Sequence, residues 1–389
     1  MFKVLTLNNI SVTGLERLPR ENYEVASEVQ HPDAVLVRSF KMHDWDVPDT
    51  LQAIGRAGAG VNNIPVDDMT IKGIPVFNAP GANSNAVQEL VLTGILLSAR
   101  NICQAWDFSR GLEGTDAKIT KQVEAGKIDF VGFELPGKAI GVVGLGAVGI
   151  KIANTAVSLG MRVIGFDPKI TVQAAWQLSH QVEQAGSIDD LLSQCDFVTF
   201  HVPLIDATRN MINAERLKSM HDDVTILNFS RAGIVNDEAV IRALNSGKVR
   251  AYICDFPSNL LKKSPKVITL PHLGASTTEA EDNCAIMVAE QVKDYLENGN
   301  ISNAVNFPTI KMAKIPGQHR LTIAHKNMPN IIGPITNAIA KAEINIIDML
   351  NKSLNEAAYT LIDIEAKLPQ LIIDEITAID GVLNVRCLK

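Results

Sequence analysis

Short runs of apolar and β-branched residues alternate with longer stretches of helical periodicity along most of the chain. The runs are DAVLVRS, LQAIGRAG and IPVFNAP in a first group, and KAIGVVGLG, RVIGFDP, DFVTFHVP, VTILNFS, VRAYICDF and KVITLPH in a second. Strands that are separated by helices are typical of parallel sheets, in which the helices cover the faces. The pattern therefore predicts an α/β protein with two doubly wound parallel sheets.

Two long helical patterns indicate where these sheets divide. The stretch NAVQELVLTGILLSARNI, residues 85–102, follows the first group of strands, and TEAEDNCAIMVAEQVKDYLENGN follows the second. We interpret the first as a crossover helix and the second as a helix that returns to the first sheet. We therefore expect a substrate-binding domain over residues 1–100 and 285–310, and a nucleotide-binding domain over residues 101–284.

The last part of the chain reads as a separate module. The stretch NAVNFPTIKMAKIPGQHR is rich in Pro, Lys and Asn, as linkers are, and the pattern after it is strand, helix, strand, strand, helix, strand. This is the ferredoxin-like βαββαβ order. We expect this module over residues 316–389.

Composition narrows the classes of function. No apolar run reaches the ~18 residues of a membrane span, and the start MFKVLTLNN reads as a strand, so we expect a cytoplasmic protein with no membrane partner. The five cysteines are scattered without a CxxC pair, which predicts neither disulfides nor a metal site. A net charge of −7 argues against nucleic-acid binding and favours a small-molecule substrate.

A glycine motif supplies the strongest chemical signal. Gly144, Gly146 and Gly149 form G-x-G-x-x-G between an apolar strand and a helix, and Asp167 ends the next strand. Glycines at this spacing allow a tight turn, let backbone N–H groups approach a pyrophosphate, and let the helix pack against the strand. Asp167 would hold the ribose hydroxyls. Because a carboxylate there repels a 2′-phosphate, we expect NAD rather than NADP as the cofactor.

Three polar turns, HVPL, NFSRAGIVN and PHLGAST, follow later strands of the same group. Ligands of doubly wound sheets bind beyond the carboxyl ends of the strands, so these turns are candidates for the site. Arg231 could hold a substrate carboxylate through two parallel hydrogen bonds, or form a salt bridge at a helix start. His272 and His201 are equal candidates for an imidazole that takes a hydroxyl proton, and either could instead be a hydrogen-bonded, partly buried side chain.

Together these motifs resemble a known family. GRAGAGVNNIPVDDM, GKAIGVVGLGAVG, HVPL, NFSRAGIVN and PHLGAST, in this order and spacing, are similar to the D-isomer-specific 2-hydroxyacid dehydrogenases over nearly the whole chain. The resemblance implies that Arg231 binds the carboxylate and carbonyl oxygen of the substrate, and that His272 exchanges the hydroxyl proton. The cofactor-binding residues that it implies, beside the glycines and Asp167, are Ala147, Val148, His201, Val202, Pro203, Thr208, Ser230, Asp255 and Gly274.

Within the family, the chain is most similar to members that act on a phosphorylated acid. The resemblance implies NAD-dependent oxidation of D-3-phosphoglycerate to 3-phosphohydroxypyruvate, the first step of L-serine biosynthesis. It implies substrate contacts from Arg38, Ser39, Arg56, Gly58 and Asn83. Arg56 could also be an ordinary solvated arginine, and Asn83 a turn or helix-cap residue. Two alternatives stay open: a less selective D-2-hydroxyacid dehydrogenase that reduces glyoxylate or hydroxypyruvate, and a non-catalytic NAD-sensing regulator.

One stretch departs from the family pattern. Family members carry a glutamate in a D-V-F-x-x-E-P stretch that hydrogen-bonds the catalytic imidazole, whereas this chain reads ICDFPSNLLKKSP and places Asn259 at that position. An amide can orient an imidazole but does not stabilise its cation, so either His272 works without an acid, or Asp255 or another acid replaces the glutamate. Glu279 fits a capping box that begins at Ser276, so we interpret it as a helix start.

The C-terminal module resembles an ACT domain, a regulatory module that pairs across subunits and binds amino acids, in the stretches HKNMPN, EINIID and AAYTLIDIE. The resemblance implies L-serine as an effector, with His325, Asn327 and Asn345 meeting its amino and carboxylate groups between two copies. These residues could instead cap helices and turns. A module of this fold leaves an edge strand and one sheet face open, so we expect a homodimer or homotetramer.

Overall fold

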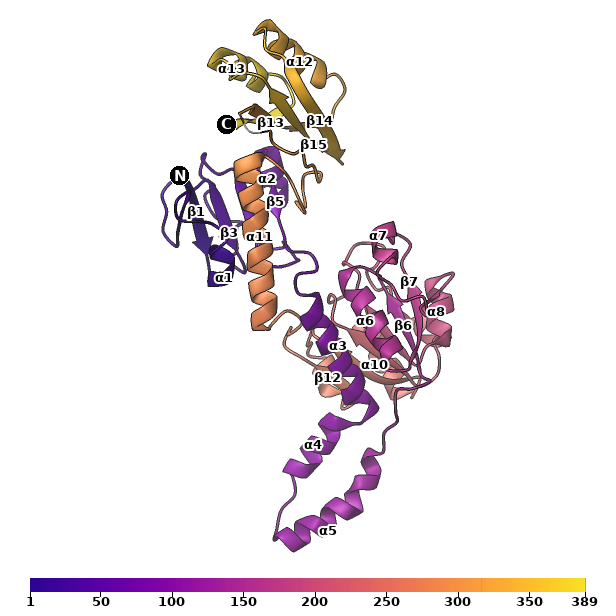
Figure 1. The fold of residues 1–389 in the computed structure, drawn as a ribbon. Helices are drawn as coiled ribbons and strands as arrows, with labels where there is room; N and C mark the ends of the chain where they lie inside the picture. The colour runs from indigo at the N-terminus through magenta and orange to yellow at the C-terminus, as the bar shows by residue number, and fades with distance from the viewer. Residues whose placement is uncertain (316, 389) are drawn as a thin grey trace. The chain divides into compact units, whose positions relative to one another are not determined.

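The computed structural model describes residues 1–315 and 317–388 of the chain. They form two compact units, Met1–Asn83 with Thr278–Lys389, and Ser84–Thr277 (Figure 1). The chain leaves the first unit once and returns to it through a long helix, α11 (Thr278–Asn298).

These boundaries differ from those expected from the sequence, which lie after residue 100 and after residue 284. The helix α3 (Ser84–Ala99) is expected from the sequence in the first domain, but its Val91 and Ile95 side chains pack with Ile140 of the second unit. Because α3 is apolar on most of its surface, its pattern does not indicate which sheet it covers. The whole of α11 belongs to the first unit, which moves the second boundary to Thr278.

The second unit is built on a seven-stranded sheet in the order β12-β11-β10-β9-β6-β7-β8, and its strand pairs are parallel. The central strands β6, β9 and β10 are buried at every residue, which is typical of parallel strands covered on both faces. Its strands are β6 (Ala139–Val143), β7 (Arg162–Phe166), β8 (Glu183–Gln184), β9 (Phe197–Phe200), β10 (Val224–Asn228), β11 (Val249–Cys254) and β12 (Val267–Thr269). Its helices besides α3 are α4 (Ile102–Arg110), α5 (Asp116–Gly126), η1 (Lys127–Phe130), α6 (Ala147–Ser158), α7 (Val172–Ala175), α8 (Ile188–Gln194), α9 (Ala214–Ser219), α10 (Asp237–Asn245) and η2 (Leu261–Lys263).

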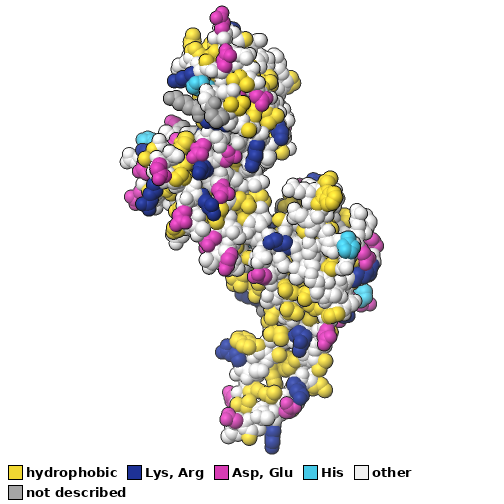
Figure 2. All heavy atoms as spheres, viewed as in Figure 1, with side chains coloured by type: hydrophobic (Ala, Val, Ile, Leu, Met, Phe, Trp, Pro, Cys, Tyr) yellow, Lys and Arg dark blue, Asp and Glu magenta, His cyan; other side chains and the backbone are white. Residues whose placement is uncertain are grey.

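The helices α4, α5 and η1 have no buried residue, and together they form an arm of the second unit. Figure 2 shows apolar side chains between charged ones on this arm. The rings of Phe108 and Phe130 lie 5.2 Å apart between their centroids and join α4 to η1. Within the described residues, no single helix is long and apolar enough to cross a membrane, although α3 and α4, bent by 66° at their junction, meet the length and composition criterion as a pair.

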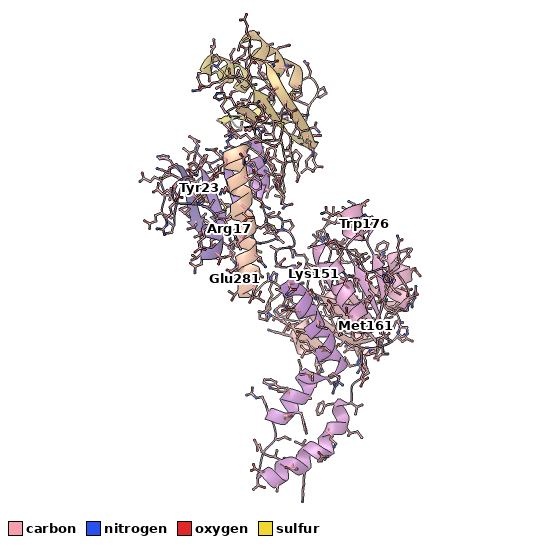
Figure 3. All side chains as sticks on the ribbon, in the orientation of Figure 1. Arg17, Tyr23, Lys151, Met161, Trp176 and Glu281 are labelled. Atoms are coloured by element: carbon pink, nitrogen blue, oxygen red, sulfur yellow. The ribbon has the colours of Figure 1, made fainter. Side chains whose placement is uncertain are left out.

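The first unit contains a five-stranded parallel sheet in the order β2-β1-β3-β4-β5. Figure 3 shows Arg17 and Tyr23 beside α11, and Tyr23 donates a hydrogen bond of 2.8 Å to Glu297 of that helix. The sheet and α11 therefore lie side by side although they are far apart in sequence. The remaining elements are β1 (Phe2–Leu7), α1 (Val12–Leu15), β2 (Tyr23–Ala26), β3 (Ala34–Val37), β4 (Ala53–Arg56), α2 (Val66–Ile71) and β5 (Val76–Phe77).

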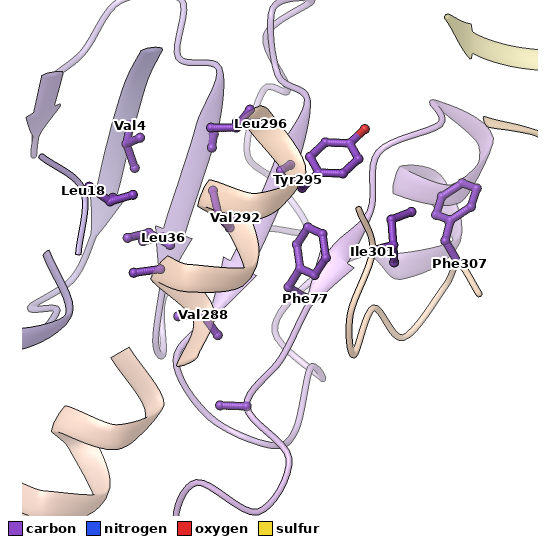
Figure 4. Close-up of a cluster of buried hydrophobic side chains, with 14 of the residues drawn as sticks. Val4, Leu18, Leu36, Phe77, Val288, Val292, Tyr295, Leu296, Ile301 and Phe307 are labelled. Carbon is purple, nitrogen blue, oxygen red and sulfur yellow. The ribbon is translucent and has the colours of Figure 1, made fainter. Parts of the chain in front are cut away.

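The core of this unit forms where α11 packs against the sheet, with Val288 and Val292 facing Leu36 (Figure 4). A Cβ atom at Gly55 of β4 would lie 3.0 Å from Val292, so the strand and the helix approach too closely for a larger residue. A Cβ atom at Gly14 of α1 would lie 2.5 Å from the Cβ atom of Ala285. Two glycines therefore set the position of α11.

The C-terminal module has the element order strand, helix, strand, strand, helix, strand that the sequence predicts. Its antiparallel sheet has the order β14-β15-β13-β16, and α12 and α13 supply apolar side chains to a core with the sheet. The elements are β13 (His319–Lys326), α12 (Ile332–Lys341), β14 (Ile346–Leu354), β15 (Ala357–Ile364), α13 (Gln370–Thr377) and β16 (Val382–Leu388).

A buried ion pair attaches this module to the rest of the first unit. Arg320 is 1% exposed, and its Nε and Nη2 atoms donate to the carboxylate of Asp363 at 2.7 and 2.8 Å. Its remaining N–H groups donate to the carbonyl oxygens of Asn298, Met312 and Ala313 at 2.8–3.0 Å. Removing one partner of such a pair typically costs ~3–5 kcal/mol, because the other charge stays buried. The pair therefore specifies where the module sits on the end of α11.

Candidate functional site

The residues predicted to bind cofactor and to act on substrate in the second unit all follow the carboxyl ends of strands of its sheet. Parallel strands bring these ends to one edge, which is where ligands of such sheets bind. The positions are Gly144, Gly146, Ala147, Val148 and Gly149 after β6, Asp167 after β7, His201, Val202, Pro203 and Thr208 after β9, Ser230 and Arg231 after β10, Asp255 after β11, and His272 and Gly274 after β12.

The glycine turn leaves room for an anion. A Cβ atom at Gly149 would lie 1.9 Å from the carbonyl oxygen of Gly144, and one at Gly144, where φ is +92°, would lie 2.5 Å from the carbonyl oxygen of His201. These two glycines are therefore required for packing. A Cβ atom at Gly146 would meet no atom within 4 Å, so the turn is open there, directly before the N-terminus of α6. Backbone N–H groups at a helix N-terminus bind phosphate, so the turn fits the pyrophosphate of a dinucleotide.

Asp167 is held in place by backbone donors from both sides. The N–H group of Leu145 in the glycine turn donates to Oδ2 at 2.9 Å, and the N–H group of Lys169 donates to Oδ1 at 2.8 Å. A carboxylate has about four lone-pair sites, so both oxygens can accept a further hydrogen bond from ribose hydroxyls. The residue therefore fits the role of a ribose acceptor and also links the turn to the end of β7.

The two candidate imidazoles differ in their surroundings. Burial lowers the pKa of His201 to about 3, because desolvation disfavours the imidazolium cation. Its Nε2 atom lies 2.9 Å from the hydroxyl oxygen of Thr199. A ring that stays neutral at every pH above about 4 is a poor proton acceptor, which leaves His272 as the candidate base.

Hydroxyl groups hold the loop after β9 against neighbouring backbone. Thr208 donates to the carbonyl oxygen of Pro203 at 2.6 Å and accepts the N–H group of Ile205 at 2.9 Å. Ser230 donates to the carbonyl oxygen of Val202. The hydroxyls of Thr208 and Ser230 thus shape the loop that borders the glycine turn.

A buried amide, which is not among the residues predicted from the sequence, holds the turn of Arg231. The Asn228 side chain is 1% exposed, donates to the carbonyl oxygen of Arg231 at 2.9 Å and accepts the N–H group of Ser230 at 3.2 Å. The guanidinium of Arg231 donates one bond, to the Ser230 carbonyl oxygen at 2.7 Å, so donors remain for a ligand. An asparagine that ends the apolar strand VTILN is the signal that could have identified it.

Asp255 holds the turn of His272 in the same manner. It is 1% exposed, and its two carboxylate oxygens accept the N–H groups of Leu273 at 2.9 Å and Gly274 at 2.8 Å. His272 itself has a left-handed backbone, with φ of +58°, and its ring meets the edge of Phe256 at 5.3 Å between centroids. The carboxylate of Asp255 therefore fixes the backbone that follows His272.

The surroundings of His272 show whether another group replaces the family glutamate, at whose position this chain has Asn259. Within residues 84–277, which the structure describes completely, no carboxylate hydrogen-bonds the ring of His272, and the side chain of Asn259 makes no hydrogen bond. The alternative in which Asp255 replaces the glutamate is not what the unit shows, because the carboxylate of Asp255 bonds to the N–H groups of Leu273 and Gly274 and not to the ring of His272. The aromatic ring of Phe256 is the neighbour that this unit provides to the imidazole.

The predicted substrate contacts lie in the first unit, at the ends of the neighbouring strands β3 and β4. Arg56 donates through Nε to the carbonyl oxygen of Arg38 at 3.1 Å. A Cβ atom at Gly58 would lie 1.8 Å from Nη1 of Arg56, so the absent side chain makes room for the guanidinium. Ser39 is tied to Asn8, whose side-chain oxygen accepts its N–H group at 3.1 Å. Asn83 is the last residue of this stretch of the unit.

The residues predicted to bind an effector do not meet within one C-terminal module. His325 is 1% exposed, and its Nε2 atom lies 2.9 Å from Thr360, so its ring faces the interior of the module. Asn327 follows β13 and donates to the carbonyl oxygen of Asn355 at 2.9 Å. Asn345 precedes β14, which begins beside Ile364, at the opposite end of the sheet from Asn327. A ligand that touches both asparagines needs two copies of the module.

Comparisons with known proteins agree with this geometry. Residues 102–274 match the family described as D-isomer specific 2-hydroxyacid dehydrogenase, NAD binding domain. A D-3-phosphoglycerate dehydrogenase of Methanocaldococcus jannaschii is 35% identical over 339 residues, which are 84% of this chain and 61% of that protein. A D-3-phosphoglycerate dehydrogenase of Haemophilus influenzae is 31% identical over 350 residues, which are 87% of this chain and 81% of that protein. The chain thus spans less than two thirds of the first relative and most of the second.

Solved structures give the same fold. The NAD⁺-bound 3-phosphoglycerate dehydrogenase of Entamoeba histolytica has a TM-score of 0.61 at 25% identity, covering 78% of this chain and 98% of its own. The D-mandelate dehydrogenase of Rhodotorula graminis has a TM-score of 0.66 at 20% identity, covering 81% of this chain and 99% of its own, which shows a shared fold.

We expect two glycine substitutions in the turn to separate folding from cofactor binding. Gly149→Ala should lower the melting temperature, because its Cβ atom would overlap the carbonyl oxygen of Gly144. Gly146→Ala should melt as the wild type does but bind NAD more weakly, because its methyl group enters the space open to the pyrophosphate. Thermal unfolding and calorimetric titration of NAD check both. Unchanged NAD affinity in a folded Gly146→Ala variant would place the dinucleotide elsewhere.

Proposed function

The chain belongs to the D-isomer specific 2-hydroxyacid dehydrogenases, and on that basis we propose that it oxidises D-3-phosphoglycerate to 3-phosphohydroxypyruvate with NAD, the first step of L-serine biosynthesis. The observation that carries the proposal is the convergence of an open glycine turn, Asp167, Arg231 and His272 at one edge of one sheet. The match to the Haemophilus influenzae D-3-phosphoglycerate dehydrogenase over 81% of its length supports this substrate over other D-2-hydroxy acids.

Each group has a defined task in this proposal. Arg231 holds the substrate carboxylate through a planar pair of N–H donors, which fixes the orientation of the hydroxyl-bearing carbon. His272 takes the hydroxyl proton on a ring nitrogen while the hydrogen on that carbon leaves with its electron pair. Bound NAD supplies the acceptor for that hydride. Asn228 and Asp255 keep the two turns in place, so that the backbone of neither turn has to be ordered when substrate binds.

The phosphate of the substrate needs a second cationic site. Arg38 and Arg56 stand at the ends of β3 and β4, whose last paired residues are Val37 and Arg56. Guanidinium groups bind phosphate oxygens in a bidentate manner, and two of them suit a group with about two negative charges. This pair favours a phosphorylated acid over the small acids that a less selective dehydrogenase reduces.

The C-terminal module is proposed to be an ACT domain that binds L-serine. The βαββαβ order and the antiparallel sheet support this assignment. A two-fold symmetric pair of modules brings Asn327 of one copy near Asn345 of the other, because a two-fold axis beside the sheet reverses its ends. The inward-facing ring of His325 then supports the site from below rather than touching the ligand.

The arm formed by α4, α5 and η1 supports a homodimer through the second unit. Its apolar side chains have no core of their own, since Trp106 is 59% exposed, Ile128 is 73% exposed and Val131 is 70% exposed. Large exposed apolar patches mark interaction sites, and a symmetric interface uses the same patch from both copies. A second copy of this chain is the partner that we propose.

The activity test combines a substrate panel with one substitution. Initial rates of NAD reduction should be highest, as kcat/KM, on D-3-phosphoglycerate, lower on D-glycerate and absent on L-lactate. His272→Ala should lower kcat by ~10²–10⁴-fold, as loss of an acid–base group does, with the Kd of NAD unchanged.

His201→Asn is the matched control for this test. Because burial lowers the pKa of His201 to about 3, its ring is neutral across the assay range, and the pH-rate profile should keep its shape in this variant. If no D-acid is turned over with NAD, the non-catalytic regulator is the better explanation. If reduction of glyoxylate or hydroxypyruvate dominates, the protein is the less selective dehydrogenase.

Titration with L-serine tests the regulatory proposal. Calorimetry should detect serine binding to the wild type, and Asn345→Ala should weaken it by roughly 10- to 100-fold, because one hydrogen bond to a charged group contributes ~1.5–3 kcal/mol. D-Serine is the control ligand. If L-serine does not bind the wild type, the module serves assembly alone.

Sedimentation velocity tests the arm. The wild type should sediment as a dimer or tetramer, and Ile128→Glu should shift it toward a smaller species, because the interface would bury an unpaired carboxylate. Val172→Glu on α7 is the control, since Val172 is 76% exposed and lies outside the arm. An unchanged sedimentation coefficient for Ile128→Glu would contradict this role of the arm.

A further inference from the structure

Arg38, one of the two arginines that are proposed to bind phosphate, already forms an ion pair within the protein. Nη2 of Arg38 lies 2.7 Å from Oε1 of Glu281, and the side chains are 37% and 42% exposed. Glu281 lies near the N-terminal end of α11, as Figure 3 shows. The carboxylate of Glu281 therefore occupies the guanidinium group with which Arg38 would bind a phosphate.

The second arginine belongs to the same cluster. Arg56 donates to the backbone of Arg38 and shares the end of the sheet with it. The thiol of Cys284, on the same helix as Glu281, lies among these charges. Burial raises its pKa, the guanidinium groups of Arg56 and Arg38 act against that rise, and the carboxylate of Glu281 adds to it. Two cations and one carboxylate thus act on the thiol of Cys284.

The backbone of α11 leaves Glu281 little freedom. The neighbouring Asp282 accepts a hydrogen bond from Ser11, and Ala285 is in contact with Gly14. Val288 lies one turn further on, where Gly55 of the sheet leaves space for the helix. Because these contacts fix the first turns of the helix, Arg38 can be released by rotation of the Glu281 side chain and not by retreat of the helix.

We propose that Glu281 is an affinity-setting residue, an internal carboxylate that occupies Arg38 until the phosphate of the substrate displaces it. The proposal rests on the function proposed above. A dianionic phosphate competes well for the guanidinium, whereas an acid without phosphate leaves the ion pair intact. The competition also weakens the binding of free phosphate. Free phosphate has no second group whose contacts could offset the loss of the Arg38–Glu281 ion pair. Glu281 therefore lowers the affinity of the site for any ligand that carries a phosphate and leaves the affinity for acids without phosphate unchanged.

The test compares two single-charge changes on one helix. Glu281→Gln removes the competing carboxylate and keeps the size of the side chain. Glu290→Gln is the matched control, because Glu290 pairs with Arg17 at 3.8 Å on the same helix and is 56% exposed. Calorimetric titrations of the full-length variants use 3-phosphoglycerate, D-glycerate and inorganic phosphate in turn, and steady-state assays give kcat and KM.

Glu281→Gln should lower the Kd of 3-phosphoglycerate and of inorganic phosphate by about 2- to 5-fold, the range expected for loss of a competing exposed ion pair. The Kd of D-glycerate and kcat should stay at their wild-type values, and Glu290→Gln should change none of these quantities. Weaker or unchanged binding of 3-phosphoglycerate and inorganic phosphate to Glu281→Gln would overturn the inference. An equal decrease in the Kd of D-glycerate would overturn it as well. If the wild type does not bind 3-phosphoglycerate, the proposed function fails, and the titration with inorganic phosphate still decides the role of Glu281.

Discussion

Two buried polar side chains at the ends of adjacent strands, Asn228 and Asp255, hold the turns that carry Arg231 and His272. Asp255 also donates its own N–H group to the carbonyl oxygen of Asn228 at 3.2 Å, so the two turns share one hydrogen-bonded network. The network is possible because β10 and β11 are parallel and, beyond a register shift between Val224 and Thr225, pair so that Asn228 lies opposite Cys254. In an interior with few competing water molecules, a satisfied network of this type is rigid, and an unsatisfied member would be costly. The position of the site thus follows from strand direction first and from these hydrogen bonds second.

The sequence predicts the parts of the site that depend on local pattern. Gly144, Gly146, Gly149 and Asp167 stand at a spacing that requires a strand, a turn and a helix, and the structure has these elements in these places. The role of Asn228 could not be read in the same way, because it depends on which backbone groups of the following turn face the side chain. The inward orientation of His325 depends on the register of β13 between β15 and β16, which an amphipathic pattern does not specify for a central strand.

The fold shows the same division between local and distant information. The alternation of strands and helices predicts parallel sheets, and the final six elements have the predicted order. The side to which α3 belongs was not predictable, since a helix that is apolar on most of its surface can cover either sheet. The attachment of the C-terminal module was not predictable either. It depends on Arg320, whose partners include Asp363 on β15 and backbone carbonyl groups before the module, and a sequence pattern does not show that these meet.

The end of α11 explains why this attachment is firm. The last carbonyl groups of a helix lack partners within it, and they carry the negative end of the helix dipole. Arg386 donates to the carbonyl oxygens of Tyr295 and Leu296 at 3.2 and 3.1 Å, and Arg320 donates to that of Asn298 at 2.9 Å. The module therefore satisfies the backbone of the same helix that carries Glu281 near its other end. Because a helix moves as a rigid body, the close contacts of Gly14 and Gly55 with α11 position both the carboxylate beside Arg38 and the C-terminal sheet.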